Sequence, residues 1–209
     1  MPTLRSPGAT RFATFAGGAR RPTKAGLRHA RATIASGTDD ATSLAVAAFA
    51  LGILSKDYTT AVSVIERALS FNPSSAAAHY WGAVIHACSG NFTAVTAHAN
   101  RALRLSPFDP LAFLAHIALG HVALMEGHYD EAASRYAKSV LAGPHFSVGY
   151  FCQAIALALA GRVEEAGPIV RQLLELSPNF RSSKFFDYTV VGAFAARIIE
   201  GARLLDLPE

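Results

Sequence analysis

Apolar and polar positions between residues 42 and 180 alternate with the periodicity of amphipathic α-helices. Each unit of this pattern predicts two helices. A glycine such as Gly127 ends the first helix by taking the left-handed conformation, and a proline such as Pro144 stops the second because it cannot continue a helix. The pattern therefore predicts an all-α fold with eight antiparallel helices, arranged as four hairpins over residues 42–180.

The turn residues and small residues of these hairpins recur at a fixed period. Successive prolines are 34, 37 and 34 positions apart, and successive glycines are 37 and 34 apart. The five columns are Pro73, Pro107, Pro144 and Pro178; Gly90, Gly127 and Gly161; Tyr58, Phe92, Tyr129 and Val163; Ala61, Val95, Ala132 and Ala166; Ile65, Ala99, Tyr136 and Val170. A single two-helix unit cannot bury its apolar face, so the repeated units must stack on one another.

Repeat three carries the most complete pattern. It has Leu119-Gly120 in the first helix, Gly127-His128-Tyr129 at the turn, Ala132 and Tyr136 in the second helix, and Pro144 closing that helix. This pattern resembles the tetratricopeptide repeat family, which implies a right-handed α-solenoid of stacked helix-turn-helix repeats. Two repeats depart from it, because Lys56-Asp57 replaces the turn glycine of repeat one and Val163 replaces the turn aromatic residue of repeat four.

Both ends of the repeat region predict single helices. Residues 181–209 are expected to form a C-terminal capping segment, since the last repeat of an array needs a cover. Apolar residues recur there at helical spacing: Phe185, Phe186, Val190, Val191, Phe194, Ile198 and Ile199. At the other end, residues 25–41 are expected to form a partial repeat, the second helix of a unit whose first helix is missing.

A second resemblance concerns the segments Arg101–Leu111 and Gly201–Glu209. They are similar to the C-terminal repeat region of bacterial class III adenylate/guanylate cyclase-like proteins. In that family the repeats follow a catalytic domain, and this sequence has no β-rich segment with paired metal-binding aspartates. The resemblance implies a regulatory or oligomerisation fragment of a signalling protein, as the alternative to an independent scaffold.

The positive charge is concentrated at the N-terminus. The formal net charge is +4, and the seven basic residues that precede Asp39 leave 4 − 7 = −3 for the rest. Residues 1–24 are expected to form a basic disordered tail, with a transit peptide as the alternative interpretation of residues 1–38. A nucleic-acid-binding array would carry basic residues along its whole surface, so we expect no nucleic acid partner.

The sequence also lacks the patterns of a membrane protein or an enzyme. No long uncharged apolar stretch predicts a membrane span, and the isolated Cys88 and Cys152 predict buried thiols in a reducing, cytoplasmic compartment. His116 and His121 are five positions apart, which does not place two metal ligands on one helical face. The acidic pairs Asp130-Glu131 and Glu164-Glu165 suit the positive ends of helix dipoles. We expect no metal, no cofactor and no catalysis.

The first helix of each repeat is expected to line a largely apolar concave groove. Helical spacing predicts nine partner-binding residues: Tyr80, Val84 and Ala87; Ile117, His121 and Leu124; Phe151, Ile155 and Ala158. Such a groove fits an amphipathic helix or an extended hydrophobic peptide, including the chain's own C-terminal segment. The alternatives are that these side chains belong to the core, and that the partner is a second copy of the chain.

Overall fold

The computed structural model describes residues 24–183, 185 and 192–207. The α-helices are α2 (Lys24–Ala35), α3 (Ala41–Ser55), α4 (Tyr58–Phe71), α5 (Ala76–Ser89), α6 (Phe92–Leu105), α7 (Ala112–Glu126), α8 (Tyr129–Ala142), α9 (Ser147–Leu159), α10 (Val163–Leu176) and α11 (Gly192–Leu204). No strand occurs among the described residues. The all-α solenoid fold is therefore confirmed. The tail expected at residues 1–24 lies outside the described part, apart from Lys24.

A residue in the left-handed region closes the turn of every hairpin. Gly90, Gly127 and Gly161 have φ angles of 83°, 80° and 78°. Lys56 holds the same column of repeat one and has a φ of 56°. The sequence departure at repeat one therefore leaves the turn geometry unchanged, although a residue with a Cβ pays a steric cost in this conformation.

Each second helix begins two residues after its turn residue, and its first turn is stabilised locally. The side chain of Asp57 caps α4 by accepting a hydrogen bond from the Thr60 N–H at 3.1 Å, and Asn91 caps α6 in the same way. α8 and α10 lack such a cap. They carry acidic residues in the first turn instead, Asp130-Glu131 and Glu164-Glu165, at the positive end of the helix dipole.

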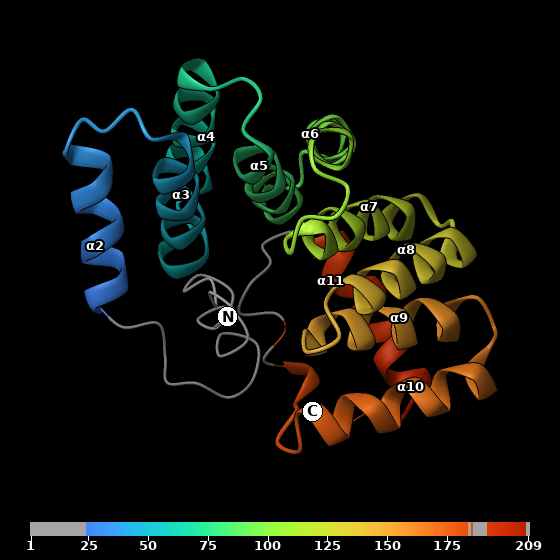
Figure 1. The fold of residues 1–209 in the computed structure, drawn as a ribbon. Coiled ribbons are helices and arrows are strands. Elements are labelled where there is room, and N and C mark those ends of the chain that lie inside the picture. The colour runs from blue at the N-terminus through green and yellow to red at the C-terminus, as the bar shows by residue number, and fades with distance from the viewer. Residues whose placement is uncertain (1–23, 184, 186–191, 208–209) are drawn as a thin grey trace, which may run out of the picture.

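The first helices of the repeats form the inner layer of the array. α3 packs on α5 and α5 packs on α7, whereas the second helices α4, α6 and α8 pack on the first helix of the following repeat. Neighbouring first helices therefore pack directly on each other from α3 to α7, whereas α7 and α9 are joined by α11, which packs on both. Figure 1 shows the helices following one another along an arc from α2 (blue) to α10 (orange), with α11 (red) behind α7 and α9.

Two hydrophobic clusters fill the array, one running through α3 to α7 and the other through α7 to α11. The third repeat's first helix, α7, contributes to both. Within repeat three, the two helices approach closely at Gly120, where an added Cβ would lie 2.4 Å from the Tyr136 ring. The small residue of the Leu-Gly pair is therefore required by the aromatic residue of the facing helix.

At the N-terminal end, α2 packs as a single helix on α3. Arg67 of α4 holds its C-terminal end, because the guanidinium donates hydrogen bonds to the carbonyl oxygens of Ile34 and Thr38, each at 3.2 Å. The same guanidinium lies 5.8 Å from the centre of the Phe71 ring. These contacts tie α2 to the first hairpin.

Candidate interaction surface

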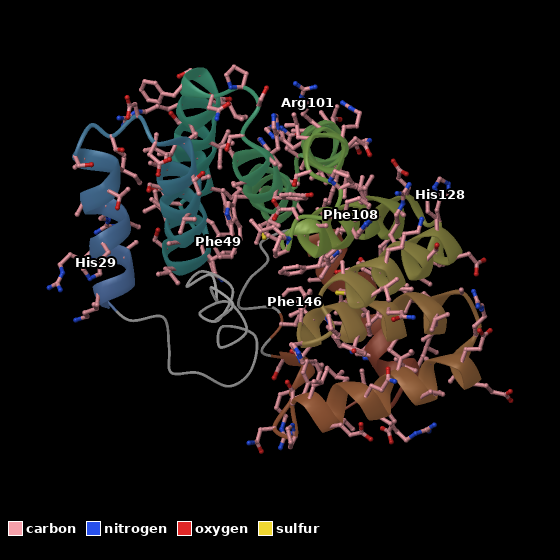
Figure 2. The ribbon with its side chains drawn as sticks, viewed as in Figure 1. His29, Phe49, Arg101, Phe108, His128 and Phe146 are labelled. Atoms are coloured by element: carbon pink, nitrogen blue, oxygen red, sulfur yellow. The ribbon has the colours of Figure 1, made fainter. Side chains whose placement is uncertain are left out.

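The histidine, cysteine and carboxylate side chains are dispersed over the array. Among the residues that the structure describes, no group of three or more His, Cys, Asp or Glu side chains is arranged to hold a metal ion. His128 is exposed at the α7–α8 turn, where Figure 2 labels it, and its Nδ1 lies 3.4 Å from a Glu126 carboxylate oxygen. Over the same described ranges, no helix is both long and apolar enough to cross a membrane.

Three histidines meet between α5 and α6, a cluster that the sequence analysis missed. His79 Nδ1 lies 3.1 Å from His98 Nδ1, and the ring centres of His86 and His98 are 5.1 Å apart. Burial lowers the pKa of all three, and the neighbouring rings of His86 and His79 help to bring the pKa of His98 to about 4. The cluster is therefore neutral at pH 7. The seven-residue spacing of His79 and His86, two helical turns, was the available signal.

The residues six positions before each turn residue share one side of the first helices, and we call them the groove column. They are Ala50 in repeat one, Val84 in repeat two, His121 in repeat three and Ile155 in repeat four. Val84, His121 and Ile155 are the middle members of the three triplets that the sequence analysis predicts for the groove. His121 and Ile155 of this column lie on the side of α7 and α9 where α11 packs, as the contacts below show.

The C-terminal helix α11 lies across α7 and α9, the first helices of repeats three and four. Its Phe194 ring lies 4.6 Å from the His121 ring, and His121 Nδ1 is 2.7 Å from the Tyr136 hydroxyl oxygen. Further along α11, Gly201 meets Ile155: a Cβ added there would lie 2.7 Å from Ile155 Cγ2. Both groove-column residues of the C-terminal repeats are therefore covered by the chain's own helix.

A single cationic side chain attaches α11 to the end of α7. Arg197 donates hydrogen bonds to the Tyr129 hydroxyl and, at 3.2 Å, to the carbonyl oxygen of Met125. Its guanidinium carbon also lies 5.7 Å from the centre of the Tyr129 ring. The side chain thus combines hydrogen bonds with a cation–π contact at the turn of repeat three.

The segment before α11 extends this cover with aromatic contacts. The ring centre of Phe185 lies 5.0 Å from that of Phe151 in α9 and 6.2 Å from that of Phe194. Phe180 contacts the same Phe151 ring at 5.0 Å. Of the apolar residues predicted for the capping segment, Phe186, Val190 and Val191 lie outside the described residues.

The flanking members of the predicted groove triplets lie in the core. They are buried: Tyr80, Ala87, Ile117, Leu124, Phe151 and Ala158. Tyr80 illustrates the reason, because its hydroxyl donates a 2.6 Å hydrogen bond to the carbonyl oxygen of Ser106, toward the next repeat rather than toward the groove. Of the nine predicted residues, only Val84 and His121 keep partial exposure.

The environment of His121 changes its acid–base chemistry. Burial between α7, α8 and α11 lowers the pKa of His121 to about 3, because the charged ring would lose its hydration. The ring is therefore neutral at every pH near neutrality. It forms a hydrogen bond with Tyr136 and packs on Phe194 as a largely apolar surface.

In repeats one and two, no helix of the described C-terminal residues packs on α3 or α5. Ala50 and Val84 are half-buried. Beside them, Phe49 of α3 and Trp81 of α5 pack with ring centres 4.4 Å apart, and Phe49 is labelled in Figure 2 between these two helices. Cys88 follows Val84 by one helical turn, is half-buried and forms no disulfide. This side of α3 and α5 is apolar.

Comparison with known proteins agrees with this architecture. The model of the family described as "Tetratricopeptide repeat" matches residues 44–110 and 117–179, which together make up more than half of the chain. The chain belongs to the tetratricopeptide repeat family. Arrays of this kind present extended concave binding surfaces. No curated protein matches the chain, and the resemblance to cyclase-like proteins receives no support from these comparisons.

Several solved structures of MamA share this tetratricopeptide fold. "MamA AMB-1" is 17% identical, with a TM-score of 0.54 over 75% of this chain and 98% of MamA. "Crystal structure of MamA protein" is 18% identical, with a TM-score of 0.55 over 88% of this chain and 97% of that one. "MamA RS-1 ArsTM double mutant" is also 18% identical, with a TM-score of 0.56 over 72% and 82%. At this identity the likeness shows the fold alone.

Proposed function

We propose that this tetratricopeptide protein is a non-catalytic interaction scaffold that binds a helix or an apolar peptide on its concave side. One observation carries the proposal: a helix, α11, is already seated on this side, across the groove column of repeats three and four. A surface that accepts one amphipathic helix has the shape and polarity to accept another.

The open part of the concave side, formed by α3 and α5, is the proposed binding surface for a partner protein. It continues the groove column from His121 to Val84 and Ala50. The Phe49 and Trp81 rings, which contact each other between α3 and α5, form its aromatic base. Aromatic residues in a desolvated centre contribute most to protein interfaces. We therefore place the main binding contacts on this part.

Affinity capture with matched charge variants tests the proposal. Val84→Glu puts a carboxylate in the groove column, whereas Leu141→Glu puts one on the outer helix α8, where Leu141 is 85% exposed. We expect the same proteins to be captured by the wild type and by Leu141→Glu and to be lost with Val84→Glu. Circular dichroism melts check that each variant is folded, and Ala50→Glu repeats the test if Val84→Glu is not.

A rival surface is tested in the same experiment. Phe108, on the loop between α6 and α7, is 97% exposed, and Figure 2 labels it. If Phe108→Ser loses the captured proteins while Val84→Glu keeps them, the partner binds the edge of the array and the concave-groove proposal is wrong.

A further inference from the structure

We propose that α11 competes, within the same chain, with a helix of an external partner for the groove over α7 and α9. The residues of α11 that face this groove then indicate which residues such a partner helix must carry. This inference rests on the proposed function, helix binding along the first helices, and deepens it by giving the chemistry of a helix that would bind over α7 and α9. The partner helix would carry an aromatic residue, an arginine three positions later, an isoleucine at the next position and small residues seven and eight positions after the aromatic.

The contact face of α11 supplies this pattern. Phe194, Ile198, Gly201 and Ala202 are buried, and Arg197 is half-buried. Their spacing places them on one side of the helix. The opposite side of the helix, with Ala196, Glu200 and Arg203, stays exposed.

The arginine position is specific to repeat three. Arg197 donates a hydrogen bond to the hydroxyl of Tyr129, which holds the column two residues after the turn. Phe92 and Val163 hold this column in repeats two and four and have no hydroxyl, while Tyr58 of repeat one lies beside the Cys88 thiol. A partner helix with an arginine at this position would therefore be guided to the turn of repeat three.

The glycine position sets the distance between the helices. An added Cβ at Gly201 would lie 2.7 Å from Ile155 Cγ2 and 3.2 Å from the Ile155 carbonyl oxygen. The carbonyl belongs to α9 and cannot move aside as a flexible side chain would. A large residue at this position would lift the helix away from the groove, so only a small residue fits.

α11 is a suitable competitor because, within the described part of the chain, it packs on fewer helices than the first helices of the repeats do. It packs on α7 and α9, whereas α5, for example, is enclosed by α3, α4, α6 and α7. A terminal element with few neighbours opens at a lower free energy than the repeats beneath it. In cis, its advantage over an external helix is its high effective concentration rather than a different set of contacts.

A peptide in trans tests the inference on the full-length protein. The probe is a fluorescein-labelled peptide of residues 192–207, and its binding is measured by fluorescence anisotropy. Gly201→Leu should detach α11, while Gly192→Leu is the matched control, because an added Cβ at Gly192 meets no atom within 4 Å. We expect Gly201→Leu to bind the peptide at least about tenfold more tightly than the wild type or Gly192→Leu.

The ring of His121 provides a second measurement on the same proteins. With α11 seated, burial holds the pKa of His121 at about 3, so its NMR signals should not titrate between pH 7.5 and 5. In Gly201→Leu the pKa should rise toward its ordinary value of about 6.5, and saturating peptide should reverse the change. A peptide carrying Arg197→Ala should reverse it less.

The outcomes separate the inference from the proposed function. Equal peptide binding by all three proteins would overturn the inference, as would a His121 that titrates in Gly201→Leu without any peptide binding. If Gly201→Leu fails to fold, Arg197→Ala and Phe194→Ala in the full chain replace it and must give the same two results. None of these outcomes depends on the capture experiment with Val84→Glu, which tests the open part of the concave side.

Discussion

The two halves of the array use the same repeat to make different surfaces. In repeats one and two, α3 packs directly on α5, and Ala50 and Val84 of the groove column keep partial exposure. In repeats three and four, α11 lies on both α7 and α9 and covers His121 and Ile155. The same repeat fold therefore presents different side chains in its two halves, because α11 covers residues of α7 and α9.

Removal of α11 should have the largest effect on this difference. A chain that ends at Phe180 exposes Ile155, Phe151 and the apolar face of His121, and a surface of this kind promotes association. We expect aggregation, or a melting temperature lower by roughly 5 °C or more, since each kcal/mol shifts it by about 2–4 °C in a chain of this size. Deletion of residues 1–24, expected from sequence to form few contacts, should change the melting temperature little.

The opposite ranking would contradict this account. A chain ending at Phe180 that stays monomeric with an unchanged melting temperature, beside a tail deletion that unfolds the protein, would mean that cap and tail are assigned the wrong way round. Light scattering and a thermal melt on the same samples distinguish the cases.

A glycine series compares the packing of the two halves. Gly120→Ala should destabilise the protein by about 1–3 kcal/mol, because the Tyr136 ring is fully buried and has no space to move. Gly82→Ala should cost less, since its nearest contact is the half-buried His98 ring, at 2.8 Å. Denaturant melts measure both.

Gly167→Ala is the matched control for this series. Its added Cβ would meet only Arg171 at 3.9 Å, so the higher helix propensity of alanine should stabilise α10 by up to about 1 kcal/mol. Equal destabilisation by all three substitutions would refute the packing argument.

Acid should weaken the N-terminal half through the histidine cluster. Because the pKa values of His79, His86 and His98 are lower in the folded than in the unfolded protein, the unfolded chain binds more protons, and stability falls as the pH drops from about 6.5 toward 4. Among the neighbouring charges, Arg101 lowers the pKa of His79, whereas Glu66 raises that of His86.

His98→Gln measures this acid effect. Between pH 7 and pH 4.5, the variant should lose roughly 1–2 kcal/mol less stability than the wild type, after allowance for the partial exposure of the ring. Parallel profiles of stability against pH for the two proteins would mean that protonation of His98 does not lower the free energy of unfolding.

The turn of repeat one should show the smallest effect. Lys56→Gly removes the steric cost of a left-handed residue with a Cβ and should stabilise the protein by up to about 1 kcal/mol. The reverse comparison is Gly90→Ala, which should destabilise repeat two by a similar amount. A destabilised Lys56→Gly protein would show that contacts of the lysine side chain stabilise the fold by more free energy than the relief of backbone strain does.

The sequence predicted the fold well because the fold depends on local signals. The turn columns specify where helices end, and even Lys56 adopts the conformation of the glycines that it replaces. The exposure of the predicted groove residues could not be derived in the same way, since periodicity selects a helix face but does not say how far a neighbouring repeat covers it. Val84 and Tyr80 are one turn apart, yet only Val84 keeps partial exposure.

Two contacts could not be derived from periodicity at all. The contact between His98 and His79 depends on the packing of α5 against α6. The hydrogen bond from Arg197 to Tyr129 joins residues that are 68 positions apart. Composition and spacing contain no information about such long-range contacts. The apolar spacing around Phe194 and Ile198 predicted a covering helix, but the choice of the concave side follows from the packing of α11 on α7 and α9.

Thiol labelling at two equivalent positions tests the central difference between the halves most directly. Val84→Cys and Ile155→Cys place one thiol in the groove column of each half, in a background with Cys88→Ala and Cys152→Ala. We predict that Ile155→Cys reacts at least about tenfold more slowly than Val84→Cys, because α11 must first open, and that adding Gly201→Leu removes most of this protection. Equal labelling rates at the two positions in the presence of intact α11 would contradict the account.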